Sequence, residues 1–98
     1  MVNLNEQIAN MNFWLEQLPA ERRQFFFRWL EEHTRNLGAT LTLDTRLDSR
    51  FHLWIESLPE EAQDREICIV LSEIAWVGIF HNQIHPYIQM PARLLSIR

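Results

Sequence analysis

The sequence contains no lysine, only two glycines and a single cysteine. One cysteine cannot form a disulfide within the chain, so an oxidising compartment is not required. Two isolated glycines exclude the glycine-rich loops that cradle phosphate groups. The longest apolar stretch, residues 67–80, is interrupted by Ser72 and Glu73 and is shorter than the about 20 residues that a membrane span needs. The N-terminal segment has neither a basic leader nor a long apolar run, so we expect a cytoplasmic protein without a membrane span.

Positive charge is also scarce, and it is unevenly distributed. Residues 1–73 hold all 13 acids and seven arginines, a balance of −6, whereas residues 74–98 hold two arginines and no acid, a balance of +2. The sum is the formal net charge of −4. An acidic body of this kind is poorly suited to gripping a phosphate backbone, so we do not expect a nucleic-acid partner.

The sequence is rich, by contrast, in apolar and aromatic residues. Of its 98 residues 47% are hydrophobic, and the aromatics comprise six Phe, four Trp and one Tyr. Each large ring can bury roughly 150–250 Å². So many aromatic side chains in a short sequence predict either a tightly packed aromatic core or an exposed apolar surface that another chain covers.

Apolar residues recur at steps of three and four residues, which is the period of an amphipathic helix. Gly38 is expected to end the second helix in a left-handed cap, and the fourth helix, apolar almost all round, is expected to lie at the centre. The expected helices run from Leu4 to Gln17, from Pro19 to Gly38, from Asp44 or Thr45 to Ser57, and from Pro59 to about Ile84. The sequence therefore predicts one all-α domain, 1–98: a bundle of four main helices built as two helix–Pro–helix hairpins (about 4–38 and 44–85), joined by an extended linker (39–43) and followed by a short C-terminal extension (86–98).

The same periodicity predicts which side chains face the core. On the first helix, Phe13 and Trp14 are expected to widen the apolar stripe. The predicted core positions are Leu4, Ile8, Met11, Leu15 and Leu18 in the first helix, Phe26, Trp29 or Leu30, His33 and Leu37 in the second, and Leu43, Leu47, Phe51, Trp54 and Leu58 around the third.

An internal repeat links the two predicted hairpins. Residues 13–21 read FWLEQLPAE and residues 53–61 read LWIESLPEE, with five of nine positions identical. Both segments specify the same corner, in which a helix ends, a proline forces a turn and a new helix begins with an acid. Duplication and convergence on a common corner both explain the match, and both give the same coarse fold.

The second predicted helix offers more aromatic surface than one interior can cover. Three consecutive phenylalanines at 25–27 project over about 200° of arc. Exposed rings beside arginines are typical of interface centres. We therefore predict a protein-binding module, a small adaptor, regulator or complex subunit that forms a homodimer or docks on another protein. The predicted partner-binding residues are Arg22, Arg23, Phe25, Phe26, Phe27, Trp29, Trp76, Arg93, Leu94 and Leu95.

Catalytic motifs are missing from the sequence, so we expect no enzyme activity and no cofactor. Two alternatives remain. Residues 19–58 have a loose helix–turn–helix outline that would suit a nucleic-acid-associated regulator, although acids interleave with its arginines. His81 and His85, four residues apart, would share a helix face and could hold a metal ion or haem.

Overall fold

The computed structural model describes residues 3–82, with side chains described through residue 78. Within this range the chain forms four helices and no strand, which confirms the predicted all-α bundle. The helices are α1 (Leu4–Glu16), α2 (Ala20–Asn36), α3 (Ser49–Glu56) and α4 (Glu60–Asn82).

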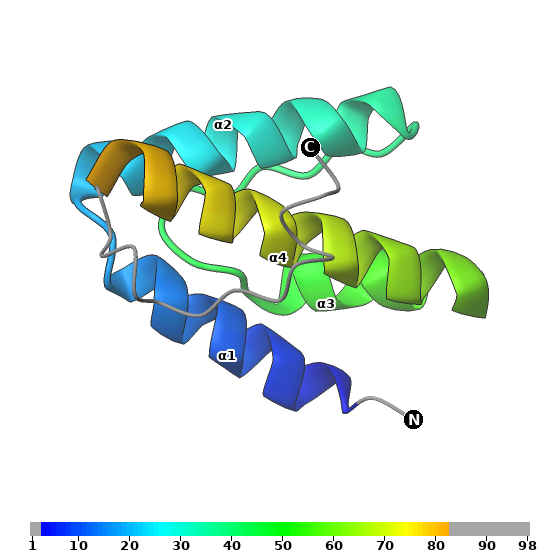
Figure 1. Ribbon diagram of the computed structural model, residues 1–98. Helices are drawn as coiled ribbons and strands as arrows, with labels where there is room; N and C mark the ends of the chain where they lie inside the picture. Colours follow the sequence, from blue (N-terminus) through cyan, green and yellow to red (C-terminus); the bar gives the residue numbers. More distant parts are fainter. Residues whose placement is uncertain (1–2, 83–98) are drawn as a thin grey trace.

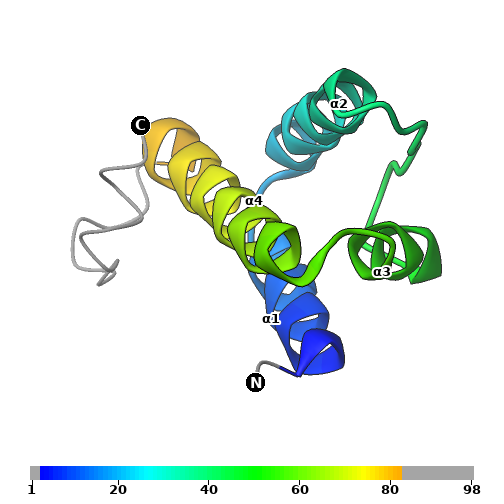
Figure 2. The same ribbon diagram turned by 90° about the vertical axis from the view of Figure 1, so that its right-hand side faces the viewer.

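Helix α4 is central, as its nearly uniform apolar sequence predicts. It contacts each of the other three helices. Figure 1 shows α4 lying between α1 and α2, which diverge from their shared corner. These two helices therefore pack mainly against α4 rather than closing on each other as a simple hairpin. Figure 2 shows α2 and α3 on the same side of α4, joined by the long connection 37–48.

The core forms from one face of each helix. Most of the predicted positions in α1 and around α3 are buried, and the central cluster includes Met11, Leu15, Phe26, Phe51 and Ile55. Burial of these side chains supplies the main favourable term in folding, because it removes apolar surface from water.

Local sequence signals set where α1 begins and where α2 ends, close to the predicted residues. Asn3 caps α1 by accepting a hydrogen bond from the Glu6 backbone N–H. Gly38 has a positive φ of 88° and follows α2 in a Schellman turn, in which the Ala39 N–H donates to the Thr34 carbonyl. The predicted left-handed cap is confirmed. Leu37, which was predicted to face the core, is instead exposed, because the helix ends at Asn36 and the turn carries the side chain outward.

The predicted start of the third helix was wrong. Asp48, rather than Asp44 or Thr45, caps α3 through its side chain. The preceding residues are not helical and bury three leucines, at positions 41, 43 and 47, in the core cluster. The backbone N–H and C=O of Leu47 both bond to the side chain of Asn12, so the polar groups of this buried residue are satisfied without a helix. Residues 39–43, which were predicted to form an extended linker, have no regular secondary structure and are part of the longer connection 37–48.

Candidate functional site

Two of the predicted partner-binding residues are core residues. Phe26 and Phe27 of α2 are buried and contact each other edge to face, with ring centroids 5.1 Å apart. The interior accepts both rings because Leu30 and Thr34, which are also buried, lie between them around α2 and make one continuous buried face. The prediction that these two phenylalanines contact a partner is therefore corrected: neither ring reaches the surface.

Of the other predicted partner-binding residues, five are exposed or half-buried, and three lie outside the described part of the chain. Phe25 is exposed, whereas Trp29 and Trp76 are half-buried. The two arginines in the first turn of α2, Arg22 and Arg23, are half-buried as well. The last three, Arg93, Leu94 and Leu95, lie outside the described residues.

Trp29 belongs to a polar cluster between α2 and α4. Its ring stacks on the His33 imidazole, with centroids 4.9 Å apart and planes 8° from parallel. The His33 Nε2 lies 2.6 Å from the Glu66 Oε1, and the Glu66 side chain is buried. The guanidinium of Arg65 is farther away, with Nε 3.8 Å from Glu66 Oε2. This cluster gives a buried carboxylate the partner that it needs and ties α2 to α4.

Two neighbouring exposed rings lie on α1, in addition to the ring of Phe25 on α2, which is 46% exposed. Phe13 is 54% exposed and Trp14 39% exposed, and the two rings meet edge to face with centroids 5.7 Å apart. We call these two residues the α1 aromatic pair. The prediction that they widen the buried stripe was wrong: Phe13 lies two residues from Met11 and from Leu15, about 200° around the helix from either, so its side chain faces solvent.

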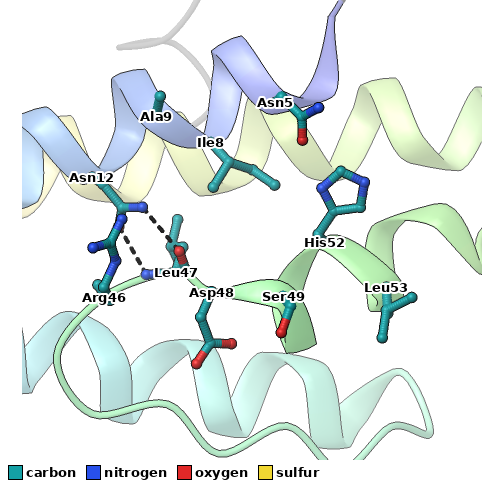
Figure 3. Close-up of a pocket in the computed structure, with 10 residues that line it drawn as sticks. All are labelled: Asn5, Ile8, Ala9, Asn12, Arg46, Leu47, Asp48, Ser49, His52 and Leu53. Carbon is teal, nitrogen blue, oxygen red and sulfur yellow. Dashed lines mark hydrogen bonds between the residues drawn. The ribbon is translucent and has the colours of Figure 1, made fainter.

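A groove of about 510 Å³ runs between α1 and α3 (Figure 3). Ile8 points into it from α1, while Leu53 lies at its α3 side with 65% of its surface exposed. The Asn12 side chain, which is buried, donates from Nδ2 to the Leu47 carbonyl (2.9 Å) and accepts at Oδ1 from the Leu47 N–H (2.8 Å). This paired contact holds the connection 37–48 against α1 and so fixes the width of the groove at one end.

The charges along the groove are mostly paired. Asp48 forms a hydrogen-bonded ion pair with Arg50, with Oδ2 and Nη2 2.7 Å apart. Hydrogen bonding from the Arg50 side chain holds the pKa of the Asp48 carboxyl below its ordinary value. His52 lies 3.3 Å from the carboxylate of Glu56. The groove is thus an apolar hollow with a polar rim and no concentrated charge of one sign.

The groove and the ring of Phe13 are neighbours on α1. Ala9 lines the groove and is exposed. Phe13 follows it by four residues, which places the two side chains about 40° apart around the helix and about 6 Å apart along it. A projecting ring and an open apolar hollow therefore stand side by side on the outer surface of α1. The sequence contained the signal for the ring, since its helical position lies opposite the core stripe, but not for the groove, which depends on where α3 packs.

The described residues do not assemble a metal site. Among them, no group of three or more His, Cys, Asp or Glu side chains is placed to hold a metal ion. His85 and the side chain of His81 lie outside the described part of the chain, so the metal hypothesis stays a prediction. The helix–turn–helix outline is not present at 19–58, because the 37–48 connection is far longer than the three-to-four-residue turn of that motif.

Comparison with known proteins finds no matching family model, no similar curated protein and no similar solved structure. In residues 3–82, every helix is too short or too polar to cross a membrane.

Proposed function

We propose that this chain is a non-catalytic protein-binding module that docks through the α1 aromatic pair and the apolar groove beside it. The observation that carries this proposal is the exposure of Phe13 and Trp14, at 54% and 39%, in a chain that buries Phe26, Phe27 and Phe51. The proposal keeps the kind of function that the aromatic composition predicts and moves its centre from α2 to α1.

Exposed aromatic pairs are costly to maintain unless another molecule covers them. Single surface hydrophobic residues are common, but adjoining apolar side chains beside a hollow are typical of interaction sites. Tryptophan is among the residues most enriched in the energetic centres of protein interfaces. The edge-to-face contact between Phe13 and Trp14 restrains both rings before binding. The rings therefore lose less conformational entropy when a partner binds.

The surroundings of the pair suit a protein partner better than a nucleic acid. Helix α1 contains no basic residue, and its charged residues are Glu6 and Glu16. A phosphate backbone would therefore find no cation on this helix to pair with. A protein surface with apolar and polar groups can instead cover the rings and bond to the amides of Asn10 and Gln17, both of which are exposed.

The test replaces Phe13 with the photoreactive p-benzoylphenylalanine in the organism that makes the chain. The matched control places the same residue at Asp64, an exposed position on α4. Irradiation is expected to attach a protein to position 13 and not to position 64, and mass spectrometry identifies the adduct. Absence of an adduct at position 13, or equal adducts at both positions, would contradict the proposal.

A further inference from the structure

We propose that the groove between α1 and α3 receives a segment of the partner protein in which an aspartate or glutamate lies next to an aliphatic residue, and that Arg46 binds the carboxylate. The inference rests on the function proposed above and names the chemistry of its partner. Its basis is how charges pair along the groove. Arg46, which lines it, has no ion pair among the residues that the structure describes, whereas the lining carboxylate of Asp48 is bound to Arg50.

The Asp48 carboxylate does not face an occupant of the groove. The Arg50 backbone N–H donates to its Oδ1 at 2.9 Å, and Arg50 Nη2 donates to its Oδ2 at 2.7 Å. Arg50 is itself held in place, because its Nη1 donates to the Thr42 carbonyl at 2.7 Å. Figure 3 shows the Asp48 carboxylate turned away from α1 and from the hollow. The charge that would repel a second carboxylate is therefore paired and points elsewhere.

Arg46 offers the groove a positive charge that is not yet used. It is exposed, and its guanidinium forms no ion pair or hydrogen bond within the described part of the chain. Figure 3 shows its side chain beside Asn12, at the opposite end of the groove from His52. The amide of Asn12 is already bonded to Leu47 through both its oxygen and its nitrogen. The guanidinium therefore presents a planar fork of N–H donors, which fits a carboxylate.

The acids that lie close by in the sequence interact with other side chains. Hydrogen bonding to Asp48 raises the pKa of the Arg50 guanidinium, and the charge of Asp44 raises it further, so Asp44 also acts on Arg50. The carboxylate of Glu56 lies 3.3 Å from His52. A carboxylate from a partner can therefore bind Arg46 without displacing an acid of this chain.

The apolar part of the groove requires an aliphatic side chain beside that carboxylate. Ile8 points into the hollow from α1, and Leu53 exposes 65% of its surface at the α3 side. An aliphatic side chain placed between them removes its own apolar surface and that of Leu53 from water. A purely apolar segment would instead desolvate the Arg46 guanidinium without giving it an acceptor, and a basic segment would meet a like charge.

The first experiment locates the docked segment with p-benzoylphenylalanine at position 53, again with position 64 as the control. The adduct at position 53 is expected to lie in the protein that attaches to position 13, in a segment where an Asp or Glu adjoins a Leu, Ile, Val or Met. Three outcomes would overturn the inference: no adduct at position 53, an adduct in a segment without an acidic side chain, or an adduct with residues 83–98 of the chain itself, which contain no acid.

The second experiment measures binding of a synthetic peptide of that segment to the purified full chain by fluorescence titration. Arg46→Gln, and replacement of the peptide's acid by its amide, are each expected to raise the dissociation constant about tenfold. The two changes together should raise it no further, because both remove the same charge-assisted hydrogen bond. The matched control is Arg28→Gln, at an exposed arginine on α2 outside the groove, which should leave the affinity unchanged.

An Arg46→Gln variant that binds as tightly as the Arg28→Gln control would overturn the inference, and so would losses that simply add. Helical circular dichroism should be the same for both variants, because both arginines are exposed.

These outcomes separate the inference from the function on which it rests. If position 13 cross-links to another protein whose affinity does not depend on Arg46, the docking function stands and the carboxylate contact fails. If position 13 gives no adduct at all, the docking function itself fails.

Discussion

The two helix–proline–helix corners have nearly the same local structure and very different environments. At the first, the Gln17 N–H donates to the Trp14 carbonyl at 3.1 Å, and at the second the Ser57 N–H donates to the Trp54 carbonyl at the same distance. Proline follows two residues later in each, directly before α2 or α4. Yet Trp14 is 39% exposed, whereas Trp54 is 9% exposed.

The difference arises from what packs around each tryptophan. Helix α3, which carries Trp54, is short and contacts both α1 and α4. Trp54 lies in the core cluster with Phe51, with ring centroids 5.8 Å apart. On α1, Trp14 lies at the edge of the core face, about 60° around the helix from Met11, and contacts the exposed ring of Phe13. Two corners with the same local structure thus place Trp54 in the core and the equivalent Trp14 at the surface. The local sequence does not distinguish these two outcomes.

The largest expected effect comes from removing each tryptophan in turn. Trp54→Ala should lower the free energy of unfolding by about 3–5 kcal/mol, since it leaves a cavity in the core. Trp14→Ala should lower it by at most about 1 kcal/mol, because the ring is half in solvent. Urea unfolding at low protein concentration measures both, since dilution removes any contribution from a second copy. Equal losses would show that the two corners are equally buried in solution and would break the comparison.

An intermediate effect is expected one step before the corners, at the equivalent positions 12 and 52. Asn12→Ala should cost about 2–4 kcal/mol, because it leaves the buried N–H and C=O of Leu47 without their partner. His52→Ala should cost below about 1 kcal/mol, since its contact with Glu56 is largely exposed. Thermal and urea unfolding of both variants check this, with Asn10→Ala as the exposed amide control. A loss at Asn12 no larger than that at Asn10 would refute the role given to this contact.

The smallest effect concerns the caps of the two helices that lead into the corners. Asn3 caps α1 without a charge, whereas Asp48 caps α3 with a carboxylate whose pKa is lowered by Arg50. Because the folded-state pKa lies below the ordinary value of 3.8, this contribution to stability is present above that value and is lost as pH falls through the lowered pKa. The Asp48 side chain is 34% exposed, so solvent screening keeps the effect below about 1 kcal/mol.

Substitution of Asp48 by Asn removes that titration while keeping a capping side chain. The stability difference between the wild-type chain and Asp48→Asn should therefore shrink between about pH 5 and pH 2. Urea unfolding across this range measures it. A constant difference would show that the Asp48–Arg50 pair does not contribute in solution.

The candidate site could be predicted only in part. The composition indicated aromatic surface in excess of one core, and the sequence pattern directed attention to Phe25, Phe26 and Phe27, of which the fold leaves Phe25 exposed and buries the other two. Three consecutive phenylalanines do not reveal which one faces outward, because that depends on how α4 lies against α2. The groove is hidden from sequence for a similar reason: its walls come from α1 and from residues 46–53, which no short-range pattern connects.

The sequence by itself determined the four helices, the two proline corners and the glycine cap after α2, because periodicity, proline and a positive φ act within a few residues. The tertiary structure alone decided that Leu41, Leu43 and Leu47 enter the core from a non-helical segment, that α3 begins at Ser49, and that Trp54 is covered while Trp14 is not. These outcomes depend on burial and on hydrogen bonds such as Asn12 to Leu47, which join residues 35 positions apart and form only when the helices pack.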